Sequence, residues 1–207
     1  DELRLQLSFI KPLDFTEVAY FDYNFINDVS IILKVNDIDF NNEINITNEY
    51  IKHYEAHIYG EIMDINNAYI FVEILPSIST NRKHIKEKYE LTNENINLSC
   101  GPVKFDAFIF FKDKRLYNTF DVDSKKVDDF LTENCGIKLY RDGLRVLPFG
   151  DSDNDWLELN AKRTSNPEHR VSTKNIIGIV SISKEKNPKL EDVLNRENIK
   201  SCIEFDD

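Results

Sequence analysis

The sequence GIKLYRDGLRVLPFGD, residues 136–151, contains the clearest structural signal in this chain. Two short apolar stretches, Ile137–Tyr140 and Leu144–Leu147, flank the pair Asp142-Gly143. Asp-Gly is a preferred pair for a two-residue hairpin turn, because glycine tolerates the positive φ that such a turn requires. The stretch therefore predicts a β-hairpin, and its Arg-Asp-Gly tip is expected to have a structural role.

Strands are predicted on both sides of this hairpin. Upstream, CGPVKFDAFIFF carries a run of aromatic and branched residues and predicts a strand at Val103–Phe111. Downstream, IIGIVSIS predicts a buried strand at Ile176–Ser183. These strands supply apolar surface that helices must cover.

Three helices are predicted between and after these strands. Ser124 can cap a helix that ends at Asn134 or just beyond it, and Asp155–Lys162 reads as a short helix. Asn187 can cap, and Pro188 can open, a last short helix. The order of strands and helices predicts an α+β fold, a mixed β-sheet with helices on one face.

Residues 1–99 are β-rich but less regular, and residues 100–207 form the better defined part. A hairpin is predicted from two alternating or β-branched runs joined by a turn at residues 64–67, and the polar stretch 81–97 is expected to be a loop or a surface helix. The strands predicted in this half are 3–7, 29–35, 54–63 and 68–75. Residues 1–99 are either a separate domain or a continuation of the sheet formed by 100–207.

Five segments of the second half carry a family resemblance when they are taken in order. They are CGPVKFDAFIFF, GIKLYRDGLRVLPFGD, DWLELNAKR, IIGIVSIS and NPKLEDVLNREN. In this order they resemble the transducer, the second domain of the GHKL ATPases, the superfamily of gyrase, MutL, MORC and the heat-shock chaperones. The likeness is greatest to bacterial chaperone-like and MORC-like proteins, in which a YRDG-type hairpin and a terminal NRE occur together. The resemblance implies a ribosomal-S-five-domain-two-like fold.

The resemblance also implies a function. A transducer couples ATP binding and hydrolysis in a neighbouring domain to conformational change, so ATP and Mg are expected to bind through the GHKL ATP-binding domain of the same polypeptide. The motion would pass to a dimer partner or to downstream segments. The chain itself has no DxGxG motif, and with only 6 glycines it cannot form a glycine-rich lid. The chain alone is therefore not expected to be catalytic, whereas its parent is expected to be an ATPase.

Arg196, in the sequence Asn195-Arg196-Glu197, is the first candidate for a functional residue. The resemblance implies that it reaches the γ-phosphate of ATP. A guanidinium suits this role, because it can hold two phosphoryl oxygens while charge builds on them. Glu197 would orient it through an ion pair. The alternative is an ordinary surface arginine at a helix end, favoured there by the helix dipole.

A second candidate is a local concentration of basic residues in an acidic chain. It consists of Lys162, Arg163, Arg170 and Lys174. These side chains are expected to face the nucleotide, the ATPase domain or a partner. The alternative is a solvated loop whose cations favour the end of a helix.

Two metal-binding patterns are incomplete in this chain. His53, Glu55 and His57 would share one face of a strand, but no fourth ligand accompanies them, and the spacing differs from HExxH. The acidic run at 151–155 begins like an EF-hand loop but has Trp156 where that loop requires glycine. No metal site is predicted, and Trp156 is expected to be a packing anchor.

Composition limits the remaining classes. A formal net charge of −11 argues against a broad nucleic-acid-binding face, since phosphate recognition needs clustered cations. The 3 cysteines lack CxxC spacing, which favours a reducing, cytoplasmic setting, and neither a signal peptide nor a membrane-spanning run is evident. The alternative function is a protein-interaction module without ATPase linkage. An ATP-binding domain elsewhere in the reading frame would decide between the two.

Overall fold

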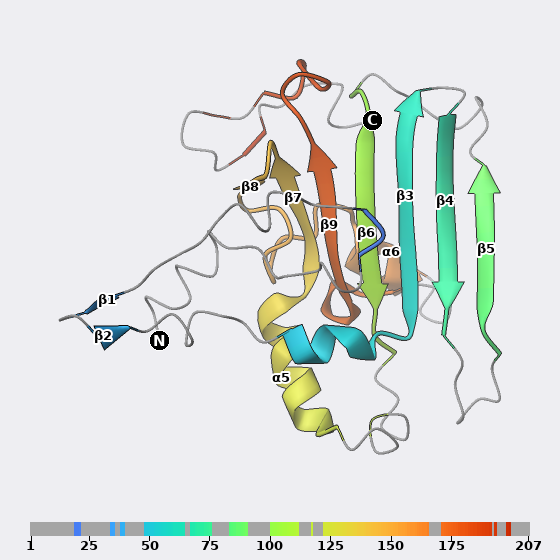
Figure 1. Cartoon of the computed structure of the whole chain (residues 1–207), viewed down its shortest axis with the longest axis vertical. Helices are drawn as coiled ribbons and strands as arrows, with labels where there is room; N and C mark the ends of the chain where they lie inside the picture. Colours follow the sequence, from blue (N-terminus) through green and yellow to red (C-terminus); the bar gives the residue numbers. More distant parts are fainter. Residues whose placement is uncertain are drawn as a thin grey trace.

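The chain is built around a mixed sheet of seven strands in the order β5-β4-β3-β6-β9-β7-β8 (Figure 1). The computed structural model describes residues 19–21, 34–35, 38–39, 48–64, 67–75, 83–90, 100–111, 117, 122–165, 171–191, 193 and 198–199. The strands are β3 (Ala56–Asp64), β4 (Asn67–Ile74), β5 (Ile85–Glu90), β6 (Val103–Ile109), β7 (Gly136–Arg141), β8 (Leu144–Val146) and β9 (Ile176–Ile182). All neighbours are antiparallel except β7 and β9, which are parallel. The predicted α+β class with a mixed sheet is confirmed.

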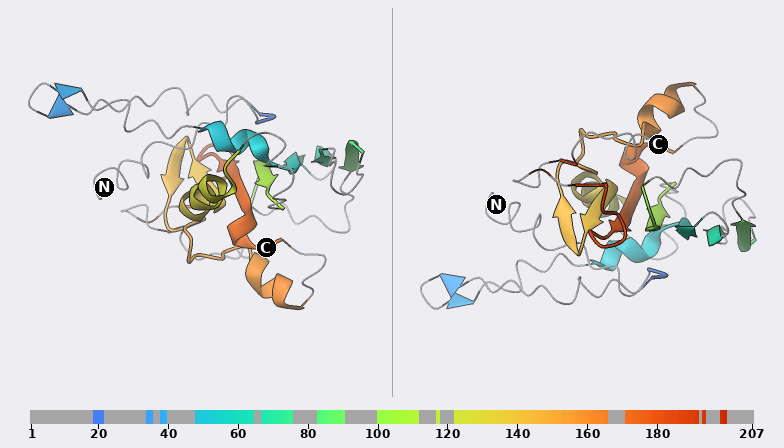
Figure 2. Two further views of the ribbon diagram at one scale, coloured as in Figure 1. Left: turned by 90° about the horizontal axis from the view of Figure 1, so that it is seen from below. Right: turned by 90° about the horizontal axis from the view of Figure 1, so that it is seen from above.

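The described residues also form shorter elements. They are the strand pair β1 (Lys34–Val35) and β2 (Ile38–Asp39), the helices α5 (Ser124–Asn134) and α6 (Leu159–Ser165), and the 3₁₀ turns η1 (Asn48–His53) and η3 (Thr173–Asn175). In Figure 2, α6 stands on the opposite side of the sheet from η1.

The sheet is continuous across residue 99. Strand β3 pairs with β6 from Ala56 opposite Ile109 to Ile62 opposite Val103. Strand β6 then pairs with β9 on its other edge. Residues before and after position 99 therefore contribute to one sheet.

The two faces of the sheet carry separate apolar clusters. On one face, α5 and η1 pack over the central strands, and the cluster comprises Ile51, Phe108, Phe110, Tyr117, Val127, Phe130, Leu131, Tyr140, Ile177 and Ile179. On the other face lies a cluster of Leu139, Val146, Phe149, Ile182, Leu190 and Ile199, and beside it a smaller one of Ala56, Ala107, Ile109 and Ile176. Each large side chain buried in this way contributes about 1.5–3 kcal/mol to stability. Helix α6 has no buried residue, and its first residue, Leu159, packs on the second face.

The helix boundaries show how capping side chains act. Asp123, and not Ser124, caps α5 by accepting a 2.9 Å hydrogen bond from the Lys125 backbone N–H, and the helix ends at Asn134 as expected. Helix α6 begins at Leu159, later than the predicted start. The reason is that the Asp155 carboxylate accepts hydrogen bonds from the backbone N–H groups of Leu159 and Asn160, each at 2.8 Å.

Other local expectations have mixed outcomes. The β3–β4 hairpin and the Asp142-Gly143 hairpin are confirmed. The expectation of a loop or helix over 81–97 is wrong for Ile85–Glu90, which is strand β5 and pairs along its whole length with β4. The predicted strand 3–7 and most of 29–35 lie outside the described residues.

The last predicted helix is also corrected. Residues 187–191 form turns and no helix. The Asn187 side-chain oxygen accepts from the backbone N–H of Ser183, which precedes it, so it does not cap a helix that follows it. Trp156 is a packing anchor as expected, since its Nε1 donates to the Ile137 carbonyl at 2.8 Å and its ring contacts Phe149 edge-on.

Candidate functional site at the end of strand β9

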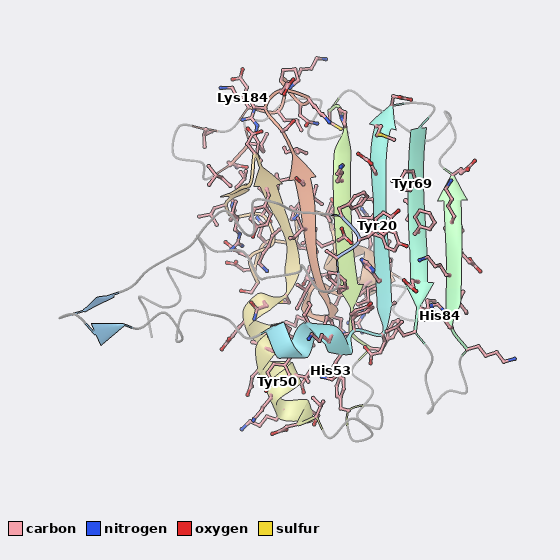
Figure 3. All side chains as sticks on the ribbon, in the orientation of Figure 1. Tyr20, Tyr50, His53, Tyr69, His84 and Lys184 are labelled. Carbon is pink, nitrogen blue, oxygen red and sulfur yellow. The ribbon has the colours of Figure 1, made fainter. Side chains whose placement is uncertain are left out.

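The hairpin tip fastens the chain where it leaves β9. Asp142 and Gly143 both have positive φ, 50° and 77°, as a tight hairpin requires. The Asp142 carboxylate oxygens accept from the Lys184 backbone N–H at 3.0 and 3.2 Å, and the Asp142 N–H donates to the Ile182 carbonyl at 3.1 Å. The Arg-Asp-Gly tip therefore holds the turn that follows β9. Figure 3 shows Lys184 at this end of the sheet, away from Tyr50 and His53 of η1.

Asn187 holds the same turn from the inside. Its side-chain oxygen accepts from the Ser183 backbone N–H at 2.9 Å, and its amide nitrogen donates to the carbonyls of Cys100 and Pro102 at 2.8 and 2.9 Å. The residue is 0% exposed. Asn187 thus joins the exit of β9 to the residues that lead into β6.

Described residues that precede and follow Arg196 in the sequence have contacts within the fold. Leu190 and Ile199 are buried in the same apolar cluster. The backbone N–H of Val193 donates to the carbonyl of Asn198 at 3.0 Å. Arg196 and Glu197 lie outside the described residues, but they belong to the short stretch of sequence that these contacts bracket.

The basic residues predicted as a second cluster lie near the other end of β9. Lys162 and Arg163 are exposed in the last turn of α6, and Lys174 is exposed in η3, immediately before β9 begins. Lys162 pairs with Glu158 at 3.6 Å. Arg170 lies outside the described residues. The length of β9 therefore separates Lys174 from the exit turn, on the order of 20 Å at the usual rise per strand residue.

The metal hypothesis for His53, Glu55 and His57 receives no support from the geometry. His57 Nε2 is 2.7 Å from Asp106 Oδ1, and Glu55 accepts from the Phe111 backbone N–H at 2.7 Å. Within the described part of the chain, no group of three or more His, Cys, Asp or Glu residues could hold a metal ion. His57 and Glu55 instead bond within the fold.

The His57–Asp106 pair belongs to a polar and aromatic face that sequence reasoning missed. Tyr20 donates its backbone N–H to Asp106 at 3.0 Å, and its ring stacks on Tyr59 with 4.2 Å between centroids. Tyr59 in turn stacks on Phe71 at 5.1 Å. One signal could have revealed the pair: Asp106 interrupts the apolar run from Phe105 to Ile109, and a charge buried there requires a partner.

Lysines on this face are matched by glutamates. Lys104 lies 3.4 Å from Glu61, and Lys88 lies 3.0 Å from Glu90. Lys86 lies 3.9 Å from Glu73 and also 5.6 Å from the centre of the Tyr59 ring. Because each of these cations has an acidic neighbour, the face offers little net charge to a polyanion.

One partly buried cation, Lys138, lies on β7. Burial lowers the pKa of Lys138 to about 7, and the charge of nearby Arg145 lowers it as well. Its Nζ donates to the Asn134 carbonyl at 2.6 Å, at the end of α5. Burial raises the pKa of Tyr140, which lies on the same strand, to about 12. Lys138 and Tyr140 make their contacts within the fold and lie apart from the exit of β9.

Comparisons with known proteins add no relative. No protein-family model, no curated protein and no solved structure matches the chain. Among the described residues, no helix combines the length and the apolar character needed to cross a membrane.

Proposed function

We propose that this chain is the transducer domain of a GHKL-type ATPase. It would couple ATP binding and hydrolysis in a neighbouring domain to a conformational change. One observation carries the proposal: described residues on either side of Arg196 in the sequence are held in the fold, through the Val193–Asn198 hydrogen bond and the buried side chains of Leu190 and Ile199. A cation that stabilises a transition state works best when the fold holds its backbone in advance.

The proposed mechanism is a charge contact between domains. ATP and Mg are held by the GHKL domain, and Arg196 donates two hydrogen bonds to oxygens of the γ-phosphate. ADP lacks that phosphate, so only the ATP state makes the contact. A ligand that contacts one arrangement better than another shifts the population toward it.

The sheet then carries the movement as one body. The exit of β9 is bonded to the β7–β8 hairpin through Asp142 and to the start of β6 through Asn187. In this proposal, a pull on the exit of β9 acts on β6, β7 and β8 together. The free thiol of Cys135 supports the cytoplasmic location that accompanies this proposal.

ATP turnover by the full-length parent protein tests the proposal. Replacing Arg196 by alanine should lower turnover by about a hundredfold or more, as loss of a transition-state charge contact does. Lys126→Ala, which removes an exposed cation from α5, is the matched control and should leave turnover unchanged. Equal turnover in wild type and Arg196→Ala would remove Arg196 from the site.

A second function, a protein-interaction module without ATPase linkage, is favoured by one feature. Strand β5 is at the edge of the sheet, and all its residues are exposed. Exposed edges can accept an added strand from a partner. This alternative becomes the better one if the parent protein hydrolyses no ATP.

A further inference from the structure

Strand β5 forms an open edge of the sheet. It pairs with β4 along its whole length, and its other side pairs with no strand in the part of the chain that the structure describes (Figure 1). All its residues are exposed. Two of them, Ile85 and Tyr89, are large apolar side chains, 39% and 48% exposed. An exposed edge that also presents apolar side chains favours the addition of another strand.

The charges of β5 cancel within the strand. Its sequence is IKEKYE, in which Lys86 and Lys88 are balanced by Glu87 and Glu90. An edge that carries lysines alone repels a second copy of itself, and many proteins keep their edges from pairing in this way. An edge with both signs can instead meet its own copy with lysine opposite glutamate. The net charge of −11 on the whole chain opposes association only weakly, because salt screens charges separated by more than about 8 Å at physiological ionic strength.

Symmetry limits how two copies of β5 can pair. Residues directly opposite in antiparallel strands point to the same side of the sheet, and a two-fold axis between the copies keeps that side unchanged. The axis must therefore pass beside a residue and not between two residues. Two such registers pair most of β5, one centred on Glu87 and one centred on Lys88. The register centred on Glu87 is unfavourable, because it sets Glu87 opposite its own copy and Lys86 opposite Lys88.

The register centred on Lys88 is the complementary one. It sets Lys86 opposite Glu90 of the second copy, twice by symmetry, and both side chains are well exposed, at 49% and 76%. It also sets Glu87 opposite Tyr89, a pair whose side chains already bond within one chain, where the Tyr89 hydroxyl donates to Glu87. Tyr89 becomes a diagonal neighbour of its own copy, at the roughly 7–8 Å that aromatic side chains can span. Lys88 meets its own copy, but Glu90 of the same chain lies 3.0 Å from it.

We propose that β5 is a homodimerisation edge, at which two copies of this chain pair antiparallel around Lys88 and join their sheets into one. This names a partner for the strand addition that forms the second candidate function. It is independent of the transducer function, because no contact in it involves ATP. Two short strands bury less surface than a standard interface of about 1,600 Å², so the dimer is expected to be weak and to form at chain concentrations on the order of 0.1 mM.

Charge reversal tests this register by sedimentation velocity of the whole chain at about 0.3 mM. Glu90→Lys alone and Lys86→Glu alone each place like charges opposite one another, so each should weaken the dimer by about tenfold or more. An equimolar mixture of the two variants restores opposite charges at both places, and it should dimerise within about threefold of wild type. Lys126→Glu makes the same charge change at an exposed site of α5 and should leave the dimer unchanged. Loss of the dimer in both variants without recovery in the mixture would overturn the inference.

A cysteine at the symmetry centre tests the geometry without relying on charge. Lys88→Cys places two thiols opposite each other with their Cα atoms about 4.5–5.5 Å apart, which a disulfide can span. Oxidised glutathione should therefore convert most of this variant to a covalent dimer. Lys86→Cys, on the same side of the same strand, places its thiols about 14 Å apart and should give no more covalent dimer than wild type. Equal crosslinking in the two variants would overturn the register.

The wild-type chain gives the simplest outcome. A concentration-dependent dimer that Glu90→Lys weakens supports the edge, and a dimer that Glu90→Lys leaves unchanged places the contact elsewhere and overturns the inference. A wild-type chain that stays monomeric at about 0.3 mM would also overturn it, and would leave β5 to a strand from a different protein. ATP turnover of the parent protein does not enter these measurements, so their failure leaves the transducer proposal to be judged by Arg196→Ala.

Discussion

The two ends of strand β9 differ in how the fold treats polar side chains. At the start, Lys174 and the α6 cations Lys162 and Arg163 are exposed to solvent. At the exit, Asp142 and Asn187 point back at the backbone and bond it at several places. Figure 1 shows α6 toward the start of β9 and the following chain at its other end.

The two ends of β9 therefore offer two kinds of polar group: exposed cations at the start, and side chains bonded to the backbone at the exit. An exposed lysine keeps most of its rotamer freedom, so binding a phosphate with it costs entropy and is weakened by salt. A residue in a segment that is already fastened loses less freedom when its ligand arrives. The exit of β9 is therefore the better place for a contact that must be accurate in the transition state, although the start is richer in described cations.

The largest expected losses of stability come from substituting two glycines, one at each end of strand β9. Gly101, at the exit, has φ +85°, and a Cβ there would lie 2.5 Å from the Lys186 carbonyl. Gly136, beside the start of β9, has φ +98°, and its Cβ would lie 2.5 Å from the Gly150 carbonyl. Alanine at either position should cost about 2–4 kcal/mol of unfolding free energy, measured by urea titration.

Activity should separate these two variants although their stabilities agree. Gly101→Ala displaces the backbone next to Asn187, so we expect turnover of the folded parent protein to fall by about tenfold or more. Gly136→Ala strains the other end and should keep turnover within about twofold. Equal turnover in the two variants would mean that the ends of β9 do not differ in function.

Asp142 should give the next largest effect. Asp142→Ala removes both acceptors for the Lys184 N–H and places alanine at φ 50°, which together should cost about 1–2 kcal/mol. An asparagine side chain tolerates that φ and keeps one acceptor, so Asp142→Asn should cost less than about 1 kcal/mol. Thermal unfolding of the two variants checks this order, and an Asp142→Ala protein as stable as wild type would contradict it.

Elements were predicted from the sequence where neighbouring residues determine them, and were missed where residues distant in the sequence do. The Asp142-Gly143 hairpin follows from turn chemistry that the two residues carry themselves. Strand β5 was missed because its lysines and glutamates resemble a solvated loop, whereas its pairing with β4 involves residues distant in sequence. The amino-acid composition of a segment predicts a strand poorly when pairing with a neighbouring strand determines whether that strand forms.

The site was predicted less well than the fold, for a related reason. Asn187 has the sequence features of a helix cap, with proline after it. Its actual partners include Cys100 and Pro102, far away in the chain, and no local pattern reveals them. Likewise Asp106 could be suspected as a buried charge, but its partner His57 could not be chosen without the sheet register.

Lys138, a partly buried lysine on β7, the strand parallel to β9, allows a pH test of whether solvent reaches its amine. The pKa of Lys138 falls from 10.5 to about 7 in the folded chain, so between these values the unfolded state binds more protons and stability rises with pH. Lys138→Met removes this dependence. The stability of wild type relative to Lys138→Met should therefore increase by about 1–2 kcal/mol from roughly pH 7 to pH 9. A constant difference would show that solvent reaches the amine.

The smallest expected effect is at Lys162. Its side chain is half exposed and pairs with that of Glu158, four residues earlier in the sequence, which is 70% exposed. Such pairs contribute about 0.3–0.5 kcal/mol, and salt screens them. Lys162→Ala should therefore lower the unfolding free energy by less than about 0.5 kcal/mol, and by still less in about 1 M salt. A loss above about 1 kcal/mol that persists in high salt would mean that the start of β9 holds its cations as firmly as the exit holds its polar groups, and the contrast between the two ends would no longer identify the site.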